Sequence, residues 1–125
     1  MTIIYRDYDH LVKDMQARII KFRDQCRRIS QLFDKGKISR MQAKYAEQLI
    51  ILDFALHEAQ GLIQFDETDH IKRRCIESLT DARISLDAIA AYATSRNNSR
   101  IYSAAQNRYE SVLNELNSYR GGSLN

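Results

Sequence analysis

Two short stretches of the chain place a carboxylate three residues ahead of a histidine. Residues 67–70 read Glu-x-x-His and residues 7–10 read Asp-x-x-His. On a helix this spacing puts both side chains on one face, which is how carboxylate-bridged metal centres are built inside helical bundles. Such a centre needs two of these motifs and glutamates from the other two helices, whereas Glu67 and Asp69 fit the first turn of a helix. The residues that a metal-binding bundle would use are His10, His57, Glu67 and His70.

Neither cysteine is placed for nucleophilic chemistry. Cys26 and Cys75 both fall on apolar helix faces, and a thiol among apolar neighbours is inert because reactivity requires a stabilised thiolate. On antiparallel helices they would lie roughly 15 Å apart, beyond the reach of a disulfide. Gly36 stands alone between lysines, so it does not form a glycine-rich phosphate loop. We therefore predict that the protein is not an enzyme and holds no metal or other cofactor.

The elements that carry these residues are long helices. Between Tyr8 and Phe33, apolar residues recur in alternating steps of four and three, and the average of 3.5 keeps one edge of a helix against a partner. The members of this seam are Tyr8, Val12, Met15, Ile19, Phe22, Cys26, Ile29 and Phe33. Similar patterns return in three later segments. The chain has no proline and four glycines, so little interrupts its helices.

Local signals divide the chain into four helices within a single domain, 1–125. Gly36 can take the left-handed conformation that ends a helix, and Ser39 with Gln42 forms a capping box that starts the next. Gly61 and the acidic residues after it mark the second break, and the glycines at 121–122 stop the last helix. The predicted helices are residues 4–33, 39–63, 67–94 and 99–120.

The fold class that follows is all-α. We predict an antiparallel up-down-up-down four-helix bundle with coiled-coil-like seams, in which the second helix is the most buried. The alternative is a bundle completed by dimerisation, because a seam as regular as that of the first helix can pair with its twin. Tyrosines on or near the seams favour an oligomer, since they suit an interface with another chain. They are Tyr8, Tyr45, Tyr102, Tyr109 and Tyr119.

Up-down order would give the bundle two ends of opposite charge. The first and third turns would meet at one end, where residues 21–47 and 83–108 together carry a net charge of +8, which leaves −5 elsewhere to give the total of +3. The predicted basic tip consists of Arg27, Arg28, Lys35, Lys37, Arg40, Lys44, Arg96 and Arg100. Such a tip suits an acidic partner. A solvated surface accounts for the same residues, because long helices need charged outer faces.

We expect a cytoplasmic protein with no membrane partner. The longest aliphatic run is residues 49–52, whereas a membrane span needs ~20 apolar residues. Residues 1–6 lack the basic and then apolar layout of a signal peptide.

The sequence thus predicts a non-enzymatic helical module that binds another protein, such as an adaptor, chaperone or assembly factor. It would act as a homodimer or larger assembly, through the basic tip or an exposed part of the first seam. An accessory nucleic-acid-binding protein using the same tip is the alternative, although +3 is a low charge for that class and the tip lacks interleaved aromatic residues. A metal-binding bundle using the histidine end is the third.

Overall fold

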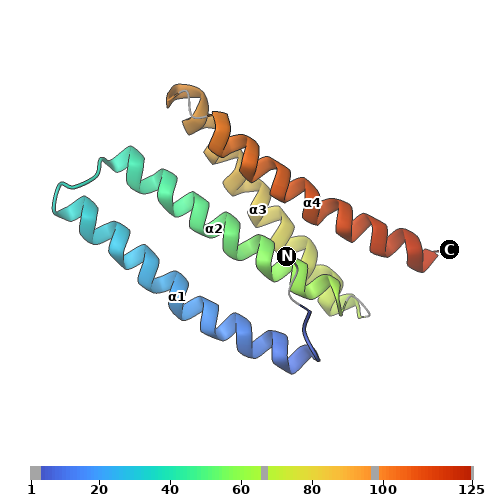
Figure 1. Cartoon of the computed structure of the whole chain (residues 1–125). Coiled ribbons are helices and arrows are strands. Elements are labelled where there is room, and N and C mark those ends of the chain that lie inside the picture. The colour runs from blue at the N-terminus through green and yellow to red at the C-terminus, as the bar shows by residue number, and fades with distance from the viewer. Residues whose placement is uncertain (1–3, 66–67, 97–98, 125) are drawn as a thin grey trace.

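The protein is an assembly of four long helices (Figure 1). The computed structural model describes the backbone of residues 4–65, 68–96 and 99–124, and the side chains of residues 4–65, 68–92 and 100–118. The helices are α1 (Tyr8–Asp34), α2 (Arg40–Ile63), α3 (Asp69–Arg96) and α4 (Ser99–Leu124). Within these described ranges there is no strand. The prediction of an all-α helical bundle is confirmed, and none of the described helices is long and apolar enough to cross a membrane.

The predicted turn between the first two helices is confirmed in atomic detail. Gly36 has a φ of +70°, the left-handed conformation that favours glycine. The amide of Lys37 donates to the carbonyl of Leu32 and that of Gly36 donates to the carbonyl of Phe33, at 2.8 and 2.9 Å, which is the Schellman pattern. Ser39 and Gln42 then exchange the two hydrogen bonds of a capping box.

Other helix ends differ from the sequence prediction. Helix α1 begins at Tyr8 rather than residue 4 because Asp7 caps it, its Oδ1 accepting from the His10 amide at 2.8 Å. Helix α3 begins at Asp69 rather than residue 67, with the Thr68 hydroxyl accepting from the Ile71 amide. Helix α4 runs through 121–122 to Leu124, since glycine permits a helix to end without requiring it.

Helix α2 ends at Ile63, the predicted residue, and Gly61 lies in its last turn and is buried. A Cβ added there would meet Leu11 Cδ1 at 2.4 Å and Tyr5 Cε2 at 3.2 Å. The absence of a side chain therefore lets α1 and the segment before it approach α2 closely.

Helix α2 lies at the centre of the molecule, and over the described side chains α3 has as many buried residues as α2. It packs along α3 and contacts both α1 and α4, whereas α4 contacts α3 and α2. Helix α1 contacts α2 and, over the described residues, no other helix. In a closed four-helix bundle each helix packs against two neighbours, so one side of α1 is uncovered here (Figure 1).

The regular seam of α1 is consequently only partly buried. Met15 and Ile29 lie in the core, together with Leu11, which is not a seam residue. Tyr8, Ile19 and Phe33 are 39%, 36% and 38% exposed. The inner faces predicted for the third and fourth helices do lie in the core. Their buried members include Cys75, Leu79, Ala82, Leu86, Ile89, Ala105, Val112 and Leu116.

Candidate functional site

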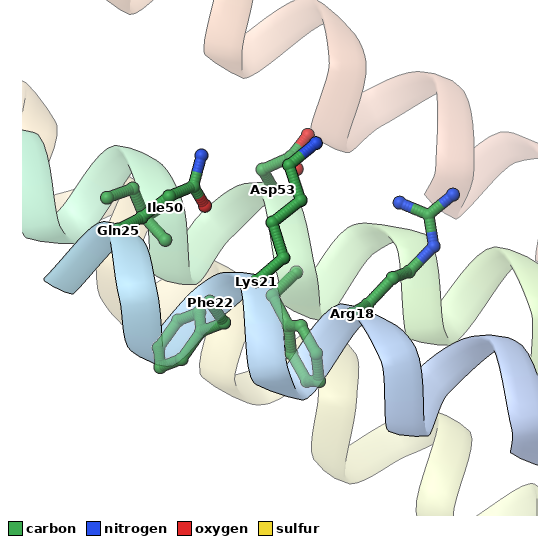
Figure 2. A pocket seen from close by; sticks show the side chains of 7 residues that line it. Arg18, Lys21, Phe22, Gln25, Ile50 and Asp53 are labelled. Carbon is green, nitrogen blue, oxygen red and sulfur yellow. The ribbon is translucent and has the colours of Figure 1, made fainter.

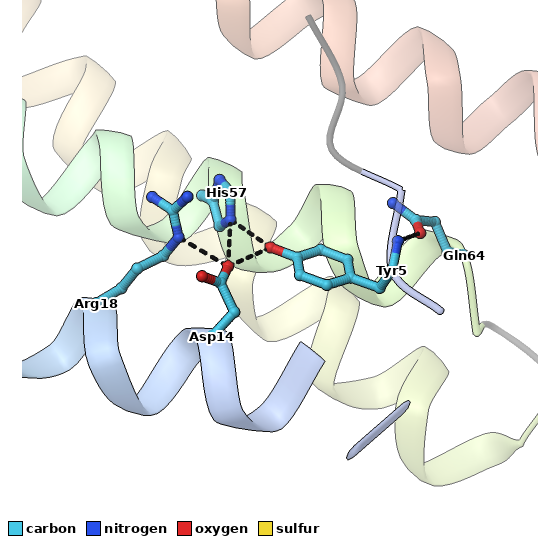
Figure 3. Close-up of polar contacts among 5 residues, drawn as sticks. All are labelled: Tyr5, Asp14, Arg18, His57 and Gln64. Atoms are coloured by element: carbon cyan, nitrogen blue, oxygen red, sulfur yellow. Dashed lines mark hydrogen bonds and ion pairs between the residues drawn. The ribbon is translucent and has the colours of Figure 1, made fainter. Parts of the chain in front are cut away.

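A polar cluster joins α1, α2 and the segment that precedes α1 (Figure 3). The Tyr5 hydroxyl donates to Asp14 Oδ2 and lies 2.6 Å from His57 Nε2. Asp14 Oδ2 also accepts from Arg18 Nε at 2.9 Å and lies 3.2 Å from His57 Nε2. Because the Tyr5 proton is directed at Asp14, Nε2 of His57 is the protonated nitrogen and donates toward the two oxygens. The Tyr5 amide donates to Gln64 Oε1 at 2.9 Å.

The surroundings of this cluster shift three pKa values. Burial, followed by the hydrogen bond to Asp14 and its charge, raises the pKa of Tyr5 to about 12. Burial opposes ionisation of Asp14, but hydrogen bonds from Tyr5, Arg18 and His57 outweigh it and lower its pKa to about 2. Burial lowers the pKa of His57 despite the hydrogen bond to Asp14. At neutral pH the cluster is therefore a neutral tyrosine and imidazole around an ion pair.

This arrangement suits anchoring better than catalysis. A phenol with a pKa of about 12 is not a nucleophile at neutral pH, and its ring is buried, with Tyr5 only 5% exposed. The cluster instead ties the segment before α1 to the far end of α2. The sequence predicts a helix at Tyr5 and does not predict the cluster, because no local pattern connects residues 5, 14 and 57.

The candidate metal ligands are not gathered into one site. His10 and His70 are exposed, His57 belongs to the Tyr5 cluster, and Glu67 lies outside the described residues. No group of three or more His, Cys, Asp or Glu side chains in the described part of the chain is arranged to hold a metal ion. The Asp-x-x-His motif at residues 7–10 is a helix cap, since the same spacing lets the Asp7 carboxylate reach the His10 amide.

The two cysteines lie in different surroundings. Cys75 is fully buried and its thiol donates to the Ala59 carbonyl at 3.8 Å. Cys26 is partly exposed, and burial together with the charge of Glu47 raises its pKa. A raised pKa disfavours the reactive thiolate, and neither residue is in a disulfide.

A small polar hollow lies between α1 and α2 (Figure 2). Arg18 and Lys21 of α1 and Asp53 of α2 line it, and Asp53 pairs with Arg108 of α4. Its volume is about 60 Å³, far below the roughly 300 Å³ or more that a drug-sized ligand occupies. The hollow can hold water but not an organic cofactor.

The basic tip is exposed wherever its side chains are described. Arg27 forms an ion pair with Asp24 at 3.5 Å, and the Arg40 guanidinium lies 6.0 Å from the centre of the Phe33 ring. The other exposed members are Arg28, Lys35, Lys37, Lys44 and Arg100. The side chain of Arg96 lies outside the described residues. The α1–α2 connection and the adjoining ends of α3 and α4 lie toward the same end of the molecule (Figure 1).

The uncovered side of α1 faces a long depression, which we call the α2 groove. Helix α2 forms its floor and α3 forms one wall, and α1 forms the other wall along the first two of its three hollows. It consists of three hollows of about 200, 320 and 600 Å³. The first two share Glu58 and Arg74, and the second and third share Gln48. Apolar residues lining it include Tyr8, Val12, Ile19, Phe22, Ile51 and Ile84.

Comparison with models of known protein families, with curated proteins and with solved structures finds no match to this chain.

Proposed function

We propose that this protein is a non-enzymatic helical module that binds another protein of acidic surface through its basic tip. It acts as an adaptor, chaperone or assembly factor in the cytoplasm, as a homo-oligomer. The observation that carries the proposal is the separation of charge, +8 at the tip end against −5 elsewhere, together with exposure of every described tip side chain. A cluster of exposed charges of one sign attracts a surface of the opposite charge and steers its approach.

The exposed seam of α1 supports the oligomeric part of the proposal. Helix α1 has three buried residues among 27, against seven among 24 in α2, although its seam spacing is that of a helix whose apolar stripe packs along a partner helix. We propose that the helices follow up-down-up-down order with coiled-coil-like seams, and that dimerisation completes the bundle.

Charge reversal tests the role of the tip. Changing Arg28, Lys35 and Lys37 to glutamate takes the net charge from +3 to −3, and all three side chains are exposed and lie outside the hollows described above. We expect this variant to keep its helical circular dichroism and to lose proteins that co-purify with the wild type from its source cells, identified by mass spectrometry. Binding of those proteins to the wild type should weaken as salt rises, because ~0.1 M salt screens exposed charges beyond ~10 Å.

A matched variant separates the tip from net charge. Changing Lys13, Lys72 and Arg73 to glutamate causes the same change in net charge at exposed positions away from the tip, and it should retain the partner. Equal binding by both variants would remove the tip as the contact. If the wild type shifts duplex or single-stranded oligonucleotides with a steep salt dependence and the tip variant does not, the nucleic-acid alternative is correct.

A further inference from the structure

We propose that the α2 groove is the seat of helix α1 from a second copy of this chain, held antiparallel to the resident α1 in a two-fold symmetric dimer. This rests on the homo-oligomer of the proposed function and names its interface. The exchange is mutual, because each α1 both lines its own groove and fills that of the other copy, as an isologous interface requires.

The packing around α2 identifies the kind of element that is missing. Helices α1, α3 and α4 all contact α2, and the α2 groove is the sector between α1 and α3. A fourth helix placed there would pack against α1 and α3 and complete a four-helix bundle with α2. It would also cover apolar side chains that the monomer leaves in water, among them Ile19 and Ile84, which is 62% exposed.

Helix α1 is long enough to fill the α2 groove. The lining residues of α2 run from Met41 to Leu62, which corresponds to about 33 Å of helix at 1.5 Å per residue. Helix α1, with 27 residues, is about 40 Å long by the same measure. Its exposed surface includes apolar side chains that α2 does not cover, since Ile20 is 63% and Ile19 36% exposed. A single helix of this chain therefore spans the groove.

Charge fixes the direction. Residues 21–34, the second half of α1, have a net charge of +2. Residues 52–63, the second half of α2, have −2 and residues 69–82, the first half of α3, have 0, whereas the first half of α2 (40–51) and the second half of α3 (83–96) have +1 each. An antiparallel arrangement sets the basic segment of one copy beside the acidic segment of the other, and a parallel arrangement sets like charges together. On the groove wall, Asp81 lines the hollow beside Ile84, and the exposed Arg23 of α1 is available to oppose it.

Sedimentation equilibrium of the full chain tests the interface. We expect a dimer for the wild type at micromolar concentration. Ile84→Asp should raise its dissociation constant at least about tenfold, because a charge is forced into an apolar contact. Ile76→Asp is the matched control, since Ile76 is a 50% exposed isoleucine of the same helix that lines none of the three hollows, and it should change the constant less than about twofold. Circular dichroism of both variants checks that they fold.

A distance measurement tests the direction without disturbing the groove. A spin label placed by Lys37→Cys in a Cys26→Ser background reports the separation of the two tips. Antiparallel α1 helices put the labels more than about 30 Å apart, near one helix length, and parallel helices put them within about 20 Å. Close labels, a monomeric wild type, or a dimer indifferent to Ile84→Asp would each overturn the inference. A monomer whose tip still binds its acidic partner refutes the dimer and the oligomeric part of the proposed function but leaves the role of the tip standing. A dimer whose tip variant keeps that partner refutes the role of the tip and leaves the dimer standing.

Discussion

At the scale of single residues, Tyr5 makes both ring contacts and hydrogen bonds with residues far from it in the sequence. Its ring is buried beside His10 and His57, with ring centres 5.4 and 6.3 Å away, and its hydroxyl joins Asp14 to His57. One residue outside any helix thus links the start of the chain to two helices. Removing the hydroxyl alone would leave the ring packing intact, so the change in the free energy of unfolding would report the contribution of the polar contacts.

Tyr5→Phe should lower the free energy of unfolding by about 1–3 kcal/mol at pH 7, because Asp14 and His57 each lose a hydrogen-bond partner at a site with limited access to water. Urea denaturation followed by circular dichroism measures this change. Tyr8→Phe provides the control, since Tyr8 is 39% exposed and lies outside the cluster. An equal loss in both variants would mean that the cluster contributes nothing specific.

The difference in the free energy of unfolding between the wild type and Tyr5→Phe should depend on pH. The pKa of Tyr5 is raised from 10.0 to about 12, so its contribution to stability is present below pH 10 and is lost as the pH rises toward 12. The advantage of the wild type over Tyr5→Phe should therefore shrink across that interval. At the acid side, the pKa of Asp14 is lowered from 3.8 to about 2, and its contribution is lost as the pH falls through that range. A wild-type advantage constant from pH 9 to 12 would contradict this account.

At the scale of elements, the contact between α1 and α2 depends on Gly61. Leu11, only 2% exposed, fills the space where a Cβ would stand. In a solvent-facing helix, replacing glycine by alanine stabilises by about 1 kcal/mol. Here that gain competes with crowding against a packed leucine.

Gly61→Leu should lower the free energy of unfolding by about 1–3 kcal/mol, the usual cost of overpacking, because the whole side chain must displace Leu11 or Tyr5. Gly61→Ala should raise the free energy of unfolding by less than the roughly 1 kcal/mol that helix propensity alone gives, because its Cβ also crowds Leu11. Thermal unfolding monitored by circular dichroism compares both with the wild type. If Gly61→Leu is as stable as the wild type, α1 does not sit on α2 at this position.

What the sequence could predict at this scale is what depends on neighbours along the chain. The helices, the glycine turn at Gly36 and the capping box at Ser39 are local events, and all three are present. The Tyr5 cluster and the packing over Gly61 join residues more than 40 positions apart, where no periodicity reports on contact. The Asp-x-x-His motif was ambiguous for a physical reason, since one spacing serves both a metal ligand pair and a helix cap.

At the scale of the whole molecule, the helices differ in how many other helices they pack against. Helix α2 is surrounded by three others, and α1 rests on α2 alone within the described residues. Stability in a domain varies with the number of buried contacts, so weakly supported elements open without global unfolding. In the proposed dimer, α1 is therefore the element whose protection from exchange should depend most on the second copy.

Amide hydrogen exchange followed by mass spectrometry should show that α1 opens more readily than α2 and α3. At concentrations that favour the monomer, peptides from the middle of α1 should exchange at least about tenfold faster than those from the middle of α2 and α3, because fewer buried contacts must break for α1 to open. Raising the protein concentration should slow exchange in α1 and in the groove-facing part of α3 around Ile84, while α4, on the other side of α2, keeps its rate. Uniform protection of all four helices at every concentration would show that α1 is held as firmly as α2 without a partner.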